Sequence, residues 1–198
     1  MSKGEITRQR ILELAAPLFN ERGFAGCSMA DIMEATGLEK GGIYRHFDSK
    51  EALAAEALKY SLSQLSVLRS AELSPVSSAV DRLRQVIQHF VERPSPIRGG
   101  CPMLNAAVDS DDGNAALRNL AKRAFAEWRR SLAAVVLEGV STGELRSDVS
   151  ADSIADLIVA SLEGALVLSR LEHDRTPLKR IQATLDGFLC SLRSHATQ

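Results

Sequence analysis

Apolar residues recur at the three- and four-residue spacing of an α-helix along almost the whole chain. Runs in which β-branched and polar residues alternate, which would indicate strands, are missing from the sequence. A chain with this spacing buries one side of each helix, so it folds by packing helices against one another. Hydrophobic residues make up 45% of the 198 positions, which is enough for a core. The sequence therefore predicts an all-α protein.

N-cap residues, glycines and prolines divide the helical pattern into segments. Ser28 and Ser49 are preferred N-cap residues, and Ser74–Pro75 marks a further helix start. Gly23 is predicted to end the first helix. Three prolines and two adjacent glycines between residues 93 and 102 predict a loop. The predicted helices cover residues 5–22, 28–35, 40–47, 49–71, 75–93, 102–108, 114–140, 150–171 and 176–192.

These segments predict two domains. Residues 1–50 form an N-terminal domain of three helices, and the helix over 49–71 connects it to a larger helical domain over 72–198. In the first domain, Ser28 caps a short helix with Asp31 at the position of a capping-box partner. Gly37 can adopt the positive φ that a sharp turn requires. Two short helices joined by such a turn form a helix-turn-helix.

The second short helix has the composition that contact with a DNA major groove requires. Gly41 and Gly42 remove side chains where the backbone could approach DNA, at a cost of roughly 1 kcal/mol each in helix stability. Residues 1–50 contain seven Lys/Arg and seven Asp/Glu, so DNA affinity has to come from the placement of charges. Positive charge and hydrogen bonds to phosphates are supplied by Lys40, Tyr44, Arg45, His46 and Lys50.

Other classes of protein find little support in the sequence. The most apolar stretch, residues 154–171, is interrupted by charges, and charged residues also interrupt any apolar segment near the N-terminus. A cytoplasmic protein without membrane association is therefore expected. Three distant cysteines without a CxxC pair indicate reduced thiols, with no metal site or cofactor. Four scattered histidines and no Ser/His/Asp or HExxH grouping indicate that the chain is not an enzyme.

The N-terminal quarter of the chain resembles the DNA-binding domain of the TetR family. The most specific part is the Lys-Gly…Tyr-x-His-Phe-x-Ser-Lys-Glu pattern that begins at Lys40. The similar stretches are Thr7–Leu12, Leu18–Phe24, Ser28–Ile32 and Gly37–Leu53. The resemblance implies phosphate contacts by Ser28, Lys40, Tyr44, His46 and Lys50, and base-facing positions at Glu39, Gly41, Gly42 and Arg45. Glu39 replaces a small hydroxyl residue, so it either accepts from a cytosine amino group or faces solvent.

The same resemblance implies a homodimer and a ligand site in the larger domain. Similar proteins dimerise through their last two helices, and the candidate interface residues here are Ala160, Gly164, Ala165, Leu185, Phe188, Leu189 and Leu192. The alternative is that these residues form the core of a single chain. Candidates to line a pocket for a small amphipathic ligand are Phe90, Met103, Phe125 and Trp128, which could also be core residues.

Cys101 is a further candidate for the ligand-binding or sensing site. It lies between two glycines and Pro102, and a thiol at a helix N-terminus near a cation ionises more readily. The segment around it resembles a TetR subgroup that includes repressors of electrophile-detoxifying reductases, some of which sense through a cysteine. Cys101 is therefore either a reactive sensor or a small buried apolar side chain.

The resemblance implies a ligand-responsive repressor whose partners are double-stranded operator DNA, a small-molecule effector and a second copy of the chain. One alternative is a repressor that senses electrophiles or oxidants through Cys101. Another is a helical scaffold protein, which would leave the pattern from Lys40 to Lys50 unexplained.

Overall fold

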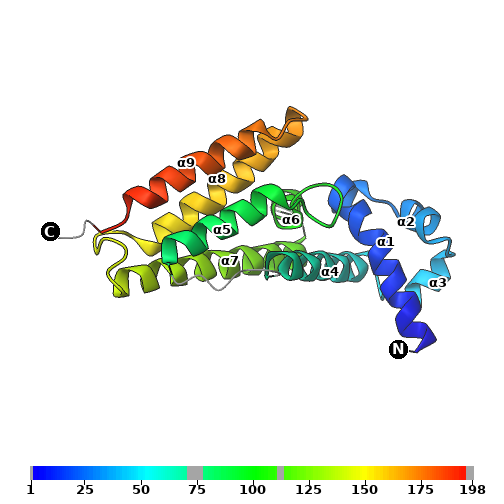
Figure 1. Cartoon of the computed structure of the whole chain (residues 1–198). Helices are drawn as coiled ribbons and strands as arrows, with labels where there is room; N and C mark the ends of the chain where they lie inside the picture. Colours follow the sequence, from blue (N-terminus) through cyan, green and yellow to red (C-terminus); the bar gives the residue numbers. More distant parts are fainter. Residues whose placement is uncertain (1, 71–77, 111–113, 195–198) are drawn as a thin grey trace. The chain divides into compact units, whose positions relative to one another are not determined.

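The computed structural model describes residues 2–70, 78–110 and 114–194. Within these ranges the chain forms nine α-helices and no strand, so the predicted all-α class is confirmed (Figure 1). None of the helices in these ranges has the length and apolarity needed to cross a membrane. The helices are α1 Lys3–Gly26, α2 Met29–Thr36, α3 Lys40–Tyr44, α4 Lys50–Ser70, α5 Ala79–Glu92, α6 Pro102–Asp109, α7 Ala115–Ser141, α8 Ala151–Leu171 and α9 Thr176–Ser191.

The chain divides into two compact units. Unit 1 comprises Met1–Leu68 and Ser95–Ala124, and unit 2 comprises Arg69–Pro94 and Phe125–Gln198. Unit 1 thus contains α6 and the first part of α7 in addition to the helix-turn-helix and α4. The functional division at residues 50 and 72 that the sequence suggests stays a prediction.

Unit 1 is built around α1. Ile11 and Ala15 of α1 are fully buried with Ile32 of α2, Ile43 of α3 and Leu53 of α4 in one hydrophobic cluster. This burial removes one side of each helix from water, which stabilises the unit by about 1.5–3 kcal/mol for each large apolar side chain.

Local signals place most of the helix ends where the sequence predicts them. The side chain of Ser28 caps α2 in a capping box with Asp31, and Gly37 ends that helix with a φ of 67°. Ser49 accepts a hydrogen bond from the amide of Ala52 in the first turn of α4. The predicted start at Ser74–Pro75 lies outside the described residues, within which α5 begins at Ala79.

The C-terminal ends of α1 and α3 differ from the prediction. Gly23 interrupts α1 with a φ of 73°, as expected of a helix-ending glycine, but a further helical segment follows it to Gly26. The second helix of the helix-turn-helix ends at Tyr44 rather than Phe47. There the amide of His46 bonds to the carbonyl of Ile43, a tighter turn that a short helix containing two glycines readily adopts.

Unit 2 packs α5, α8 and α9 against one another, with α8 and α9 side by side (Figure 1). The most deeply buried side chains include Leu83 and Ile87 of α5, Ile158 and Leu162 of α8, and Leu189 of α9. They recur at helical spacing, so each helix turns one apolar stripe toward this core.

A carboxylate from a distant loop caps the start of α5. Glu144 accepts hydrogen bonds from the Ser78 hydroxyl at 2.5 Å and from the amides of Ala79 at 2.7 Å and Val80 at 3.2 Å. Burial raises the pKa of the Glu144 carboxyl, but these hydrogen bonds outweigh burial and hold the pKa below its ordinary value of 4.5. The charged form is therefore the one that the folded state favours.

We expect Glu144→Gln to lower the free energy of unfolding by about 1–2 kcal/mol at neutral pH, because α5 loses a charged cap. A carboxyl whose pKa is lowered by folding contributes stability above its ordinary pKa and loses it as the pH falls through the lowered value. The difference between the two proteins should thus shrink below about pH 4.5. Urea unfolding at a series of pH values measures it, with the exposed Glu172→Gln as control. A difference independent of pH would contradict the capping role.

Candidate nucleic-acid interface

The N-terminus of α2 is fixed by a closed pair of hydrogen bonds. The Ser28 hydroxyl accepts from the Asp31 amide at 3.2 Å, and Asp31 accepts from the Ser28 amide at 2.7 Å. The Ser28 side chain, its amide and the ion pair with Arg22 together lower the pKa of Asp31 to about 2. Ser28 is exposed, but its amide is already engaged within the chain, and its hydroxyl also donates to Asp31 at 2.6 Å. Its predicted role as a phosphate contact therefore requires the hydroxyl to exchange Asp31 for the phosphate.

One side of α3 is buried in the core of unit 1, so the opposite side of the helix is the one that faces solvent. Ile43 is 0% exposed, and Phe47 just beyond the helix is also buried. Both lie in the same cluster as Ile32 of α2. The remaining residues of this segment lie at the surface: Glu39, Lys40, Gly41 and Arg45 are exposed, and Gly42, Tyr44 and His46 are partly exposed.

The two glycines of α3 are not required by the packing of the chain. A Cβ built on Gly41 would meet nothing within 4 Å, and one on Gly42 would make an ordinary contact of 3.7 Å with Leu38. Neither glycine has a positive φ. Because glycine lowers helix stability and this fold does not demand it, the bare backbone at Gly41 is suited to contact with another molecule.

The cations around this surface fall into two groups. Lys40 is exposed, with its ammonium 5.9 Å from the centre of the Tyr44 ring, and Arg45 is exposed beside it. Lys50 instead donates a hydrogen bond of 2.6 Å to the Phe24 carbonyl, and its ammonium lies 4.4 Å from the centre of the Phe24 ring. Sequence reasoning missed this anchoring role of Lys50, because no spacing rule connects residues 24 and 50.

The predicted ligand-binding residues are divided between the two units. Phe90 and Trp128 stack in unit 2 with ring centres 5.7 Å apart, and Phe125 is partly buried in the same unit. Met103 and Cys101 are buried at the start of α6 in unit 1, with Cys101 at the N-cap position. Cys27, Cys101 and Cys190 are free cysteines in the structure.

The predicted dimer residues also divide by exposure. Ala160 and Gly164 are exposed on α8, and Phe188 of α9 is partly exposed. The others fill the core of their own chain: Ala165, Leu185, Leu189 and Leu192. The sequence analysis missed a set of exposed apolar side chains on α8, namely Leu157, Val167, Leu168 and Leu171. Helical spacing alone does not distinguish a stripe that faces a core from one that faces out.

Comparisons with known proteins agree with this arrangement. Residues 11–57 match the family described as "Bacterial regulatory proteins, tetR family", and residues 79–185 match "Tetracyclin repressor-like, C-terminal domain". The HTH-type transcriptional repressor DhaR of Mycobacterium sp. (strain GP1) is 32% identical over 172 residues, which cover 86% of each chain.

Two solved structures are similar over nearly the whole chain. A TetR transcriptional regulator from Chloroflexus aurantiacus is 42% identical, with a TM-score of 0.93, over 99% of this chain and 100% of that one. A TetR-family regulator from Cytophaga hutchinsonii is 32% identical, with a TM-score of 0.89, over 99% of both. With family matches in both halves and a relative aligned over most of the sequence, the chain belongs to the TetR family and is a DNA-binding transcriptional regulator, not an enzyme.

Proposed function

We propose that this protein is a homodimeric repressor that reads operator DNA with α3 and leaves it when a small molecule binds in the C-terminal part of the chain. The observation that carries the DNA-reading part is Gly41, an exposed helical glycine that the fold does not need. The repressors among its relatives support the direction of regulation.

The exposed surface of α3 supports a division of roles among its residues. Gly41 and Gly42 let the backbone approach the base edges, and Arg45 and Glu39 flank them with a donor and an acceptor. Lys40, Tyr44, His46 and the hydroxyl of Ser28 supply contacts to phosphates on either side. The bond between Lys50 and Phe24 holds the start of α4 to the end of α1, so in this proposal Lys50 positions the domain.

The surface of α8 supports dimerisation with a second copy. Leu157, Gly164, Leu168 and Leu171 are exposed at separations of seven, four and three residues, which place them along one face of the helix. On the neighbouring α9, Ala183 and Gly187 are also exposed. A Cβ on Gly164 or Gly187 would meet nothing within 4 Å, so a partner helix could approach closely. A two-fold axis would bring this apolar surface against its own copy, which forms a four-helix bundle.

The mechanism follows from the spacing of DNA grooves. Two copies of α3 must lie about one DNA turn apart, roughly 34–36 Å, to enter successive major grooves. An effector that binds more tightly to a dimer with another spacing shifts the population away from the DNA-bound form. In unit 2, the stacked Phe90 and Trp128 are candidates to contact the apolar body of such an effector.

Sensing through Cys101 is the alternative route to release. Cys101 lies at the N-cap position of α6, where backbone amides favour a thiolate. Its residue is only 4% exposed, so an electrophile could reach it only after local opening. The burial of Cys101 therefore favours release by a reversibly bound ligand.

We expect Gly41→Ala to separate folding from DNA binding. The free energy of unfolding should stay unchanged or rise by up to about 1 kcal/mol, because alanine is the better helix former. Affinity for the operator should fall roughly tenfold or more, because the added methyl group holds the backbone away from the bases. Fluorescence anisotropy with a selected operator measures the affinity.

Gly4→Ala is the matched control for Gly41→Ala. Gly4 is another exposed helical glycine with room for a Cβ, and it lies outside the predicted contact residues. It should gain stability without loss of DNA affinity. Equal DNA affinity of Gly41→Ala and the unmodified protein would overturn the proposed role of α3.

We expect Leu168→Glu to dissociate the dimer, because a charge would enter the apolar interface from both subunits. The dimer dissociation constant should rise roughly a hundredfold or more, and operator affinity should fall with it. Sedimentation equilibrium measures the assembly. Leu137→Glu on α7 is the control, since Leu137 is 60% exposed and Leu168 50% exposed. A Leu168→Glu protein that remains a dimer would place the interface elsewhere.

The single tryptophan provides a test of the ligand-release mechanism. A library of small aromatic and aliphatic compounds should yield some that release operator DNA and also change the emission of Trp128, which is buried against Phe90. Phe90→Ala should weaken release by these compounds. N-ethylmaleimide tests the alternative: release by this reagent that Cys101→Ser abolishes would favour the thiol sensor over the reversible ligand.

A further inference from the structure

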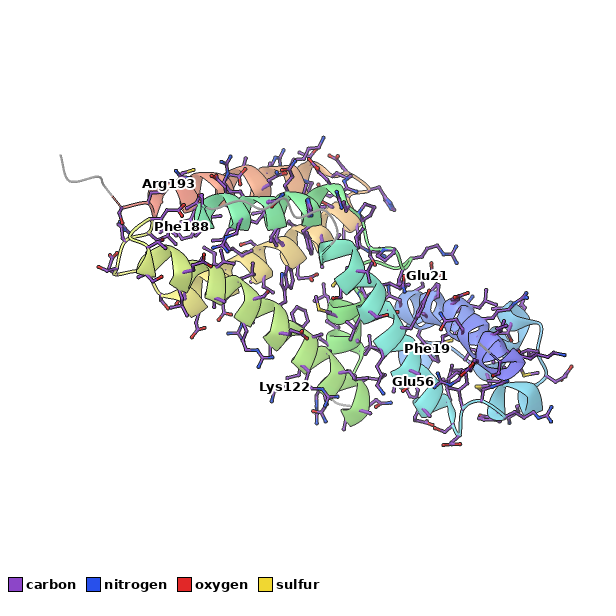
Figure 2. All side chains as sticks on the ribbon, turned by 60° about the horizontal axis from the view of Figure 1, so that its bottom comes forward. Phe19, Glu21, Glu56, Lys122, Phe188 and Arg193 are labelled. Carbon is purple, nitrogen blue, oxygen red and sulfur yellow. The ribbon has the colours of Figure 1, made fainter. Side chains whose placement is uncertain are left out.

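Unit 1 contains a cavity of about 40 Å³ that the predicted ligand residues do not line. Its walls come from α1, α4, α6 and the first turn of α7. Apolar contacts are provided by Phe19, labelled on α1 in Figure 2, and by Phe24, Leu58 and Leu117. By this measure one water needs about 10–15 Å³, so the cavity has room for roughly three or four water-sized groups. A short aliphatic molecule fits this volume and this lining.

One buried hydroxyl gives the cavity a polar partner for such a molecule. Ser61 lines the cavity and is 2% exposed. Its hydrogen is donated to the Ala57 carbonyl at 3.0 Å, within the same helix. A hydroxyl oxygen that donates one bond retains lone pairs to accept another. The cavity therefore suits a small molecule that carries a hydrogen-bond donor on an apolar body.

Polar bonds at the rim of the cavity fasten α6 to the end of α1. The Asn105 side chain donates to the Asn20 carbonyl and to the Gly99 carbonyl, each at 2.9 Å. Asp109, the last residue of α6, accepts a hydrogen bond from the Phe24 amide at 2.7 Å. Asn20, Phe24, Asn105 and Asp109 all line the cavity as well. An occupant would therefore lie against the elements that these bonds hold together.

The contacts between the end of α1, α6 and the loop before α6 are too close to admit larger side chains at two glycines. A Cβ on Gly99 would lie 2.9 Å from the Asn20 backbone, and one on Gly23 would lie 2.5 Å from an Asp109 oxygen. Both glycines have positive φ, 103° and 73°. The end of α1 also leads directly into the cap of α2 at Ser28, and its Phe24 carbonyl holds Lys50 at the start of α4. Displacement of this end thus reaches the helix-turn-helix within a few residues.

We propose that the cavity between α1, α4 and α6 binds a small aliphatic alcohol, and that its occupancy loosens the bonds between α6 and α1 and lowers DNA affinity. The binding part stands on the cavity alone, and the DNA part rests on the proposed function. The hydroxyl group donates to Ser61, and the alkyl part lies against Phe19, Leu58 and Leu117. The cavity is lined by residues of unit 1, whereas the stacked pair Phe90 and Trp128 belongs to unit 2.

The first test is a titration of the full-length protein with 1-propanol, followed by the methyl resonances of Leu58 and Leu117. We expect saturable shifts at these two residues. Glycerol, which has the same number of carbons but a polar body, should produce none. Circular dichroism gives the alcohol concentration at which the protein unfolds. If the shifts do not saturate below that concentration, the proposed site is wrong.

Two variants establish where the alcohol binds. Ala106→Val adds two methyl groups to the cavity wall and should abolish the saturable shifts, whereas Ala107→Val beside it, which does not line the cavity, should retain them. Ser61→Ala should weaken binding roughly three- to tenfold, because it removes the acceptor while leaving the fold's hydrogen bonds between helices intact. Equal binding by the Ala106→Val protein would contradict the assignment.

The second test measures operator affinity at saturating 1-propanol. We expect a decrease of about fivefold or more for the unmodified protein and for Ala107→Val, and none for Ala106→Val. Unchanged affinity with the cavity filled would overturn the coupling to DNA. A protein without operator affinity in the absence of alcohol would instead contradict the proposed function, and the methyl titration would still decide whether the cavity binds alcohol.

Discussion

The burial of Ile43 and Phe47 beneath α3 is the constraint on which the proposed DNA-binding surface depends. These two side chains lie in one cluster with Ile11 of α1, Ile32 of α2 and Leu53 of α4, so four helices share a core. A helix of five residues has too few internal hydrogen bonds to be stable alone. Its orientation comes from this anchoring, and the anchoring leaves Gly41 and Arg45 at the surface.

The end of α1 connects this core to the rest of unit 1. Gly23 breaks the helix, and the backbone that follows offers the Phe24 amide to Asp109 and the Phe24 carbonyl to Lys50. One residue thus bonds to both α6 and α4. A shift of either helix therefore breaks one of these hydrogen bonds or obliges the end of α1 to follow. This makes Phe24 the point where movements within unit 1 converge.

The sequence predicts the helix-turn-helix well because its signals are local. Ser28, Asp31 and Gly37 act within three or four residues, and each is found in the conformation that its type favours. The bond from Lys50 to Phe24 and the cavity walls join residues far apart in sequence, which no spacing rule identifies. On α8 and α9 the apolar residues surround much of each helix, so helical spacing alone does not distinguish the buried Leu185 and Leu189 from the exposed Leu168 and Leu171.

The distribution of glycines separates two demands on the chain. Gly23 and Gly99 have positive φ and touch neighbouring atoms so closely that a side chain would force a rearrangement, so the fold itself requires them. Gly41 has neither property, and alanine there would make a more stable helix. Gly41 therefore lowers the stability of α3 without improving its packing. Residues that lower stability in this way are common at functional sites, where they contribute to function instead. In the function proposed for this DNA-binding regulator, that gain would be the close approach of the α3 backbone to the base edges.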